Sequence, residues 1–299
     1  MHRLIHDLCP PLVGRWYRQQ RTGVPGWSGD YSSWSEVESR CAGYDAPEIL
    51  ARIKESQLRV RAGQGAFERD SVVFPEMEYS WPALASLLHV AAVTGGSLRV
   101  LDFGGSLGST YLQHRRWFDG IADVAWGVVE QAHFVHCGRE HFQDQRLSFH
   151  ETLVEGIVAV RPNVVLLSSV LGYLRDPGAI LREISESGIG HILIDRTGFT
   201  RDDRDRITLQ QVPASIYPAS YPCRFFSRSW LIGQLAPDYE LVATFPALDD
   251  APPFADFLGL FFMRRERERP RDEKPSARMA ASRRPPYQDG ESESGRLAL

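Results

Sequence analysis

The chain has 299 residues, of which 24% are charged and 11% are aromatic, and its net charge at pH 7 is −4. This balance lacks the basic excess of proteins that grip nucleic-acid phosphates, so we expect no nucleic-acid partner. No apolar run approaches the roughly 18 residues that a membrane-spanning helix needs. We therefore expect no transmembrane segment and a cytoplasmic location.

The cysteines and histidines do not predict a metal site. Cys9, Cys41, Cys137 and Cys223 form no CxxC pair, so we expect buried free thiols rather than a zinc ribbon or a disulfide framework. His133 and His136 share one face of a predicted helix, but no third ligand accompanies them. We expect no metal.

The sequence predicts that residues 1–95 form a helical, aromatic-rich extension or cap. Leu4–Val13 has amphipathic spacing interrupted by Pro10 and Pro11, and it would pack on the core or touch a membrane surface. Gly26–Trp34 combines turn residues with three large rings. Asp45, Pro47 and Glu48 predict the start of a helix to about Val60. After a polar link over Gly63–Asp70, the periodicity predicts a helix over Trp81–Val93.

From residue 96 to 263 the pattern is that of a parallel α/β sheet. The predicted strands are Leu98–Asp102, Val124–Glu130, Arg146–His150, Asn163–Ser168 and His191–Asp195. The predicted helices are Ser109–Phe118, Phe134–Phe142 and one that opens at Asp176-Pro177 and runs to Glu186. Tyr239–Phe245 and Phe257–Met263 predict an antiparallel hairpin, which brings the strand count to seven. Residues 264–299 are mixed in charge and poor in apolar side chains, which predicts a disordered tail.

The most specific signal is a glycine-rich turn between a strand and a helix. It reads Asp102-x-Gly104-Gly105-Ser106-x-Gly108. The dinucleotide pattern G-x-G-x-x-G fits poorly, because serine stands at its second and third glycine positions. An acidic residue at this point would repel a pyrophosphate but suits the cationic methionine end of S-adenosylmethionine (SAM). A turn that only packs helix against strand is the alternative.

Glu130 ends the second predicted strand and is followed by Gln131. A carboxylate at this place accepts hydrogen bonds from both hydroxyls of a ribose. Proteins that bind NAD place an acid in the same way, and a solvated strand-end glutamate is a further alternative. Glu130 therefore predicts nucleoside binding, and only Asp102 discriminates between SAM and NAD.

Several segments together resemble a known family. They are Trp34 with Gly43-Tyr44-Asp45, Glu68–Val72, Tyr79–Pro82, Leu101–Ser109 (LDFGGSLGS), Val129–Gln131, Leu166–Leu171 (LLSSVL), Ile194–Thr197 and Ser220–Pro222. Over residues 25–262 the chain resembles the class I SAM-dependent methyltransferases, more narrowly a bacterial family found among surface-polysaccharide genes. The resemblance implies a Rossmann-like, seven-stranded, mostly parallel sheet that ends in an antiparallel hairpin, with helices on both faces.

Two positions depart from the broad pattern of these methyltransferases. Ser106 replaces the usual middle glycine, and Phe149-His150-Glu151 stands where many relatives carry an aspartate for the adenine amine. Stacking on Phe149 or a hydrogen bond to Glu151 would substitute, although a core role for Phe149 is the stronger expectation.

The acceptor of the methyl group should bind above the ends of strands four and five. Asp195 is the predicted base or acceptor clamp, with a structural pairing to Arg196 or a cap on the next turn as the alternatives. Ser168 and Ser169 are expected to line the cofactor pocket, because no nucleophile elbow surrounds them. The residues expected to bind the acceptor are Arg69, Asp70, Trp81, Arg196, Tyr217 and Tyr221. The last two belong to Gly198–Arg228, predicted to be an ordered irregular loop.

These signals favour a SAM-dependent methyltransferase that acts on a small polar molecule or a glycan. Aromatic faces and arginines suit sugar rings and their anionic groups. A hydrophobic cap on the sheet is the alternative for the aromatic residues. For the whole chain, the alternatives are an NAD-dependent oxidoreductase and a non-catalytic nucleoside-binding module.

Overall fold

The computed structural model describes residues 26–41, 47–213, 216 and 219–266. The chain divides into two units, Met1–Arg265 and Glu266–Leu299, and the account below concerns the first. The predicted N-terminal helix, the helix cap at Asp45, Tyr217 and the predicted tail from residue 267 onward lie outside the described residues.

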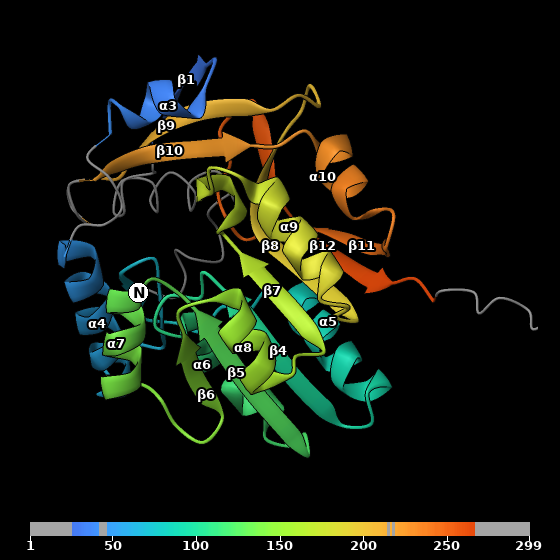
Figure 1. Cartoon of the computed structure of the whole chain (residues 1–299). Coiled ribbons are helices and arrows are strands. Elements are labelled where there is room, and N and C mark those ends of the chain that lie inside the picture. The colour runs from blue at the N-terminus through green and yellow to red at the C-terminus, as the bar shows by residue number, and fades with distance from the viewer. Residues whose placement is uncertain (1–25, 42–46, 214–215, 217–218, 267–299) are drawn as a thin grey trace, which may run out of the picture. The chain divides into compact units, whose positions relative to one another are not determined.

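A seven-stranded sheet forms the centre of the protein (Figure 1). Its strands are β4 (Ser97–Phe103), β5 (Asp123–Val129), β6 (Leu147–His150), β7 (Val164–Ser168), β8 (His191–Thr200), β11 (Tyr239–Pro246) and β12 (Ala255–Arg264). The order is β11-β12-β8-β7-β4-β5-β6. Only β12 runs antiparallel to its neighbours β8 and β11. The predicted fold class, a Rossmann-like sheet that ends in an antiparallel hairpin, is confirmed.

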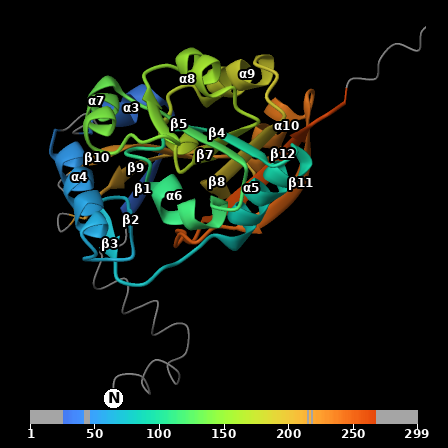
Figure 2. The same cartoon turned by 90° about the horizontal axis from the view of Figure 1, so that it is seen from below.

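Helices cover both faces of this sheet (Figure 2). The elements on one face are α4 (Pro47–Arg61), α5 (Trp81–Val93), α6 (Ser109–His114) with the short 3-10 helix η1 (Arg115–Phe118), and α7 (Ala132–His141). Those on the other are α8 (Leu153–Val160), α9 (Pro177–Glu186) and α10 (Arg228–Leu235), with η2 (Leu171–Tyr173) after β7. Asp176 caps α9 as predicted and accepts from the Ala179 amide at 2.9 Å.

The sequence analysis missed α8 and α10. Each has only eight residues, which is about two turns and too short for an apolar period to stand out. Both have clear start signals, because Thr152 and Ser227 accept from amides of the first turn.

The interpretation of Gly198–Arg228 as an irregular loop is wrong. Strand β8 continues to Thr200, and β9 (Arg206–Gln211) and β10 (Ser220–Phe225) pair antiparallel. With β1 (Gly26–Tyr31) they form a second sheet in the order β1-β9-β10, and α3 (Trp34–Glu38) follows β1. In Figure 1 this sheet lies beyond the end of β7. Pro222 is tolerated in β10 because this strand pairs on one side only within that sheet.

The predicted polar link Gly63–Asp70 instead enters a hairpin, β2 (Phe67–Arg69) and β3 (Val72–Phe74). Its two loop residues, Asp70 and Ser71, have φ values of +52° and +70°. These are the conformations of a tight hairpin turn that usually contains glycine. The strands have three residues each, and the turn has no glycine, so the usual hairpin signal is missing.

Free thiols are present at Cys137 and Cys223, both buried, and at Cys41, which is half-buried. The prediction of buried thiols is confirmed for the first two, and Cys9 lies outside the described residues. No helix in the described ranges combines the length and apolarity needed to cross a membrane.

Candidate functional site

The glycine-rich turn follows β4 and leads into α6, at the carboxyl end of the parallel strands. Gly104 has φ of +74°, and a Cβ there would come within 2.4 Å of the Val170 side chain. A Cβ on Gly105 would come within 2.5 Å of the Asp102 carboxyl group. Gly108 caps α6 with φ of +82°. The turn is therefore packed so closely that only glycine fits at these positions.

Ser106, in the middle of the turn, is left-handed with φ of +56°. A residue with a Cβ pays roughly 1–2 kcal/mol for this conformation. Its Oγ is buried and has no hydrogen-bond partner in the described part of the protein. Strained residues of this kind concentrate at ligand sites.

The Asp102 side chain lies beneath the turn and is only 1% exposed. The Trp126 indole nitrogen donates a hydrogen bond to Asp102 Oδ2 at 3.0 Å. Burial raises the pKa of Asp102 to about 7, because the charged form loses its water. The nearby Glu130 raises it further, while the Trp126 hydrogen bond acts in the opposite direction.

Glu130 lies on the other side of the turn, directly after β5, and is half-buried. Its Oε2 accepts from the Gln131 amide at 2.8 Å, and the Ser106 amide also donates to its carboxylate. Burial outweighs these bonds and raises the pKa of Glu130. Gln131 is exposed and caps α7. No lysine or arginine of the described ranges neutralises Asp102 or Glu130.

Strand β7 ends beside this turn with Ser168, which lies opposite Asp195 in the middle of β8. The Ser169 amide donates to the Asp195 carbonyl at 3.1 Å. The Asp195 side chain is 6% exposed, and its Oδ1 lacks a hydrogen-bond partner among the described residues. Burial raises the pKa of this carboxyl group to about 6.

Arg196 does not form the expected alternative pair with Asp195. Its guanidinium instead binds the carboxylate of Asp249 through Nε at 3.0 Å and Nη2 at 2.9 Å. Nη2 also donates to Asp70 at 2.5 Å. The β2–β3 hairpin and the turn between β11 and β12 are thus joined through one arginine in the middle of β8.

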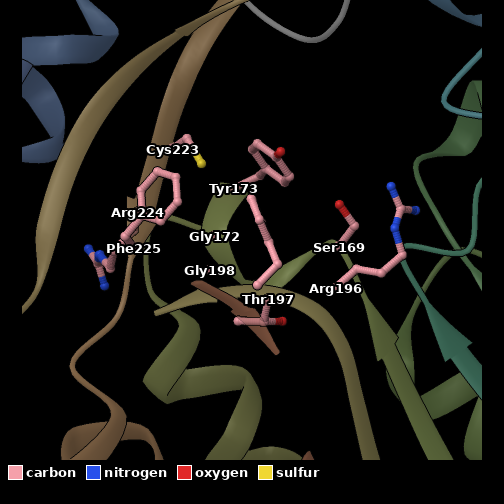
Figure 3. A pocket seen from close by; sticks show the side chains of 10 residues that line it. Ser169, Gly172, Tyr173, Arg196, Thr197, Gly198, Cys223, Arg224 and Phe225 are labelled. Atoms are coloured by element: carbon pink, nitrogen blue, oxygen red, sulfur yellow. The ribbon is translucent and has the colours of Figure 1, made fainter. Parts of the chain in front are cut away.

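A small hollow lies between the end of β7, the middle of β8 and strand β10 (Figure 3). It is lined by Ser169, Gly172, Tyr173, Arg196, Thr197, Gly198, Cys223, Arg224, Phe225 and Phe257. Its cavity volume is about 10 Å³, room for about one water molecule. Figure 3 shows Tyr173 between Cys223 and Ser169. Burial raises the pKa of the Cys223 thiol to about 12, so this cysteine is no nucleophile.

Glu68 was missed by the sequence analysis, although it lies against the first residue of α6. Its carboxylate accepts from Ser109 Oγ at 2.5 Å and from Gln57 Nε2 at 2.8 Å. Glu68 is 3% exposed, and burial raises its pKa to about 7. The apolar neighbours in Phe67 and Val72–Phe74 were the available signal that this acid is buried.

The residues predicted to bind an acceptor do not all lie together. Asp70 and Arg196 meet in the ion pair described above. Tyr221 is buried and contacts the Tyr173 ring beside the hollow, with 5.4 Å between ring centroids. Arg69 pairs with Glu78 at 3.3 Å, and Trp81 lies on the surface, 57% exposed.

Two further sequence-based expectations concern adenine and metals. Phe149 is 1% exposed and belongs to the core, packed against Gly138 of α7. A groove of about 350 Å³ between α4 and α7 is lined by Leu50, Ala51, Lys54, His133, His136, Cys137, Glu140 and His141. In the described ranges no three His, Cys, Asp or Glu side chains are arranged to hold a metal ion.

Several solved structures are similar to this chain. The N-terminal domain of EvdMO1, solved in the presence of S-adenosylhomocysteine (SAH) and D-fucose, shares 16% identity, with a TM-score of 0.44 over 74% of this chain and 97% of that one. The glycopeptide N-methyltransferase MtfA complexed with SAM shares 13% identity, with a TM-score of 0.44 over 60% and 93% of the two chains. A 1,6-didemethyltoxoflavin-N1-methyltransferase from Burkholderia thailandensis shares 17%, with a TM-score of 0.39 over 76% and 95%.

No protein-family model and no curated protein sequence matches the chain. The structural similarities are too distant to assign an activity. The function proposed below therefore rests on the residues of the site itself.

Proposed function

We propose that this protein is a SAM-dependent methyltransferase. One observation carries the proposal: two acids, Asp102 and Glu130, flank the glycine-rich turn, and no cation of the described ranges neutralises them. Burial disfavours their charged forms, so a cationic ligand at the turn would be stabilised by both. The sulfonium and amino groups of SAM supply that charge.

The charge of Asp102 argues against NAD. A pyrophosphate at the turn would lie close to the Asp102 carboxyl group, and like charges at low dielectric repel strongly. Glu130 does not discriminate in this way, because enzymes that bind dinucleotides also place an acid there for the ribose. Asp102, and not the glycines, favours SAM over NAD, because both cofactors require glycines in this turn.

The residues of the turn and the strand ends fit the cofactor. Gly104, Gly105 and Ser106 would let the backbone approach its methionine part, and the buried Ser106 Oγ still lacks a partner. Glu130 would accept from the ribose hydroxyls in place of the Gln131 amide. Gln131, Ser168 and Ser169 would line the rest of the pocket.

Asp195 is the proposed general base. When bound, SAM supplies an electrophilic methyl group on a positive sulfur. The unpartnered Asp195 Oδ1 would take the proton from an acceptor hydroxyl or ammonium group. The electron pair freed on the acceptor would form the new bond to the methyl carbon that SAM supplies, and the pair of the broken carbon–sulfur bond would leave with SAH. A pKa of about 6 keeps most of Asp195 ionised at neutral pH.

The proposed acceptor is a small polar molecule, with a sugar of a bacterial surface polysaccharide or its precursor as the specific suggestion. The family resemblance and the mixture of arginines and rings around the strand ends support it. We assign the catalytic domain to residues 96–265, a cap to residues 1–95 and a tail to residues 266–299. A cytoplasmic location agrees with such a substrate.

Calorimetric titration of the purified chain with SAM, SAH and NAD tests this function. We expect SAM and SAH to bind and NAD to bind weakly or not at all. Asp102→Asn retains the shape and the acceptor for Trp126 but removes the charge, so SAM should lose more than tenfold in affinity, about 1.4 kcal/mol. SAH lacks the sulfonium charge and should lose less.

Glu130→Ala should weaken SAM and SAH alike, by about 1.5–3 kcal/mol for charge-assisted bonds. Glu183→Ala, an exposed acid on α9, is the control and should change neither affinity. If wild type binds NAD well and neither adenosyl ligand, the protein is an oxidoreductase rather than a methyltransferase. Equal losses of SAM and SAH in Asp102→Asn would contradict the charge argument.

A further inference from the structure

An exposed aromatic surface lies outside the site described above. Met77, Trp81 and Trp117 are 38%, 57% and 37% exposed, respectively. Trp81 and Trp117 contact each other edge to face, with ring centroids 5.4 Å apart. Exposed apolar patches on soluble proteins usually mark places of binding. We call Trp81 and Trp117, with Tyr79 and Arg116, the aromatic shelf.

The rings of the aromatic shelf are held in place. Tyr79 is 7% exposed and lies against both tryptophans, with centroid distances of 5.2 Å to Trp81 and 5.8 Å to Trp117. The Arg116 guanidinium lies 5.2 Å from the ring centroids of both Tyr79 and Trp117. Rings that are already fixed lose little conformational entropy when a ligand stacks on them.

Arg116 gives the shelf a positive charge. Its side chain is exposed and makes cation–π contacts but no ion pair with a residue of the described ranges. The neighbouring Arg115 is also exposed. A ligand with a negative group could therefore bind the guanidinium without displacing a protein carboxylate.

The shelf is connected to the acceptor side of the site. Glu78, which precedes Tyr79, pairs with Arg69 of the β2–β3 hairpin, and Gln113 donates to the Glu78 carbonyl. Arg69 in turn interacts electrostatically with Asp195 and Asp249. In Figure 2, α5 and α6 lie on the same side of the sheet, opposite α8 and α9. A ligand longer than one ring could contact both places.

The size of the shelf decides what it can bind. Trp81 and Trp117 together expose roughly 250 Å² at most, given about 250 Å² for a whole tryptophan. A stable protein interface needs about 800 Å² from each partner. One or two sugar rings, whose C–H faces are apolar, match the available area.

We propose that the aromatic shelf binds a sugar ring that carries a carboxylate or a phosphate, as part of the acceptor. The ring stacks on Trp81 or Trp117, and Arg116 binds the anionic group. This inference rests on the proposed function for its link to catalysis, but the binding itself does not depend on SAM.

Titration followed by tryptophan fluorescence and calorimetry tests the inference with three probes. Tetragalacturonate carries carboxylates, glucose 6-phosphate carries a phosphate, and maltotetraose is neutral. At least one anionic probe should bind more tightly than maltotetraose, and comparison of the two shows which anion is recognised. Trp81→Ala should weaken that probe at least fivefold. Arg116→Gln should weaken it about tenfold and abolish the preference over maltotetraose.

The matched control is Arg52→Gln, because Arg52 is an exposed arginine on α4 outside the shelf. It should leave all affinities unchanged, and thermal melts check that every variant is folded. Binding of SAH without binding of either anionic probe overturns this inference and leaves the proposed function intact. Anionic probes that bind while SAM and SAH do not uphold the shelf and overturn the methyltransferase. A dimer in sedimentation that Trp81→Ala dissociates would make the shelf a protein interface and overturn the sugar assignment.

Discussion

At the scale of single residues, the two acids beside the turn differ from the acids that reach the site from the hairpins. Asp102 and Glu130 each end a strand, and a strand end in a parallel sheet fixes where its next side chain lies. Glu68 and Asp249 were not predictable in this way. Each reaches the site through a hairpin whose position depends on packing between segments far apart in the sequence, and a single sequence does not record that packing.

The burial of Asp102 makes a prediction about stability and pH. Its pKa of about 7 in the folded protein lies above the value of about 3.9 in an unfolded chain. The folded state therefore holds a proton that the unfolded state releases, and this group's contribution to stability falls as pH rises from about 4 to about 7. Asp102→Asn removes this contribution and retains an acceptor for Trp126.

We expect the free energy of unfolding of Asp102→Asn to rise relative to that of the wild type between pH 5 and pH 7.5. The rise should be up to about 1.4 kcal/mol per pH unit. Urea denaturation without ligand measures it. Burial also lowers the pKa of His114, His150 and His191, but these residues occur in both proteins and cancel in the difference. A constant difference across this range would show that Asp102 is ionised in the folded protein.

At the scale of elements, the central sheet was predicted well and the surrounding segments less so. The parallel strands are continuous apolar runs bounded by turns, and such runs carry their own signal. The strands of the β2–β3 hairpin have only three residues each, and β9 and β10 mix polar with apolar side chains, so none of them is a continuous apolar run. The hairpin is held by the bond from Arg196 to Asp70, and β10 contacts β8, and neither contact can be predicted from a local pattern.

The two carboxylates around Arg196 should contribute unequally to stability. The Arg196 side chain is 15% exposed, with Asp249 at 21% and Asp70 at 62%. Removing a partner from a buried ion pair leaves an uncompensated charge, whereas exposed pairs are weak. Asp249→Asn should lower the free energy of unfolding by about 2–3 kcal/mol and Asp70→Asn by less than about 1 kcal/mol.

Chemical denaturation of the single and double variants measures both effects and their coupling. Asp256→Asn is the control, because Asp256 pairs with the exposed Arg201 at the surface and should have no measurable effect. If Asp70→Asn costs as much as Asp249→Asn, the hairpin is anchored more tightly than the exposures indicate.

At the scale of the whole molecule, the position where the folded unit ends can be tested by truncation. The sequence placed the end of the sheet domain at residue 263, but β12 runs to Arg264. Arg264 Nη1 donates to the Ser185 carbonyl at 2.9 Å and to the Tyr239 hydroxyl at 3.1 Å. The Arg265 amide donates to the Asp238 carbonyl at 2.8 Å.

Truncation after Glu266 should therefore leave the melting temperature within about 1 °C of that of the full chain. The residues that it removes, 267–299, are too polar to form a core of their own. Truncation after Met263 removes the three bonds of these two arginines and should lower the melting temperature by roughly 6–12 °C, at about 1 kcal/mol for each lost bond and 2–4 °C for each kcal/mol. Calorimetry of the three proteins under one buffer condition measures this. If the cut after Glu266 also lowers the melting temperature by several degrees, the tail contributes to the folded structure, contrary to its composition.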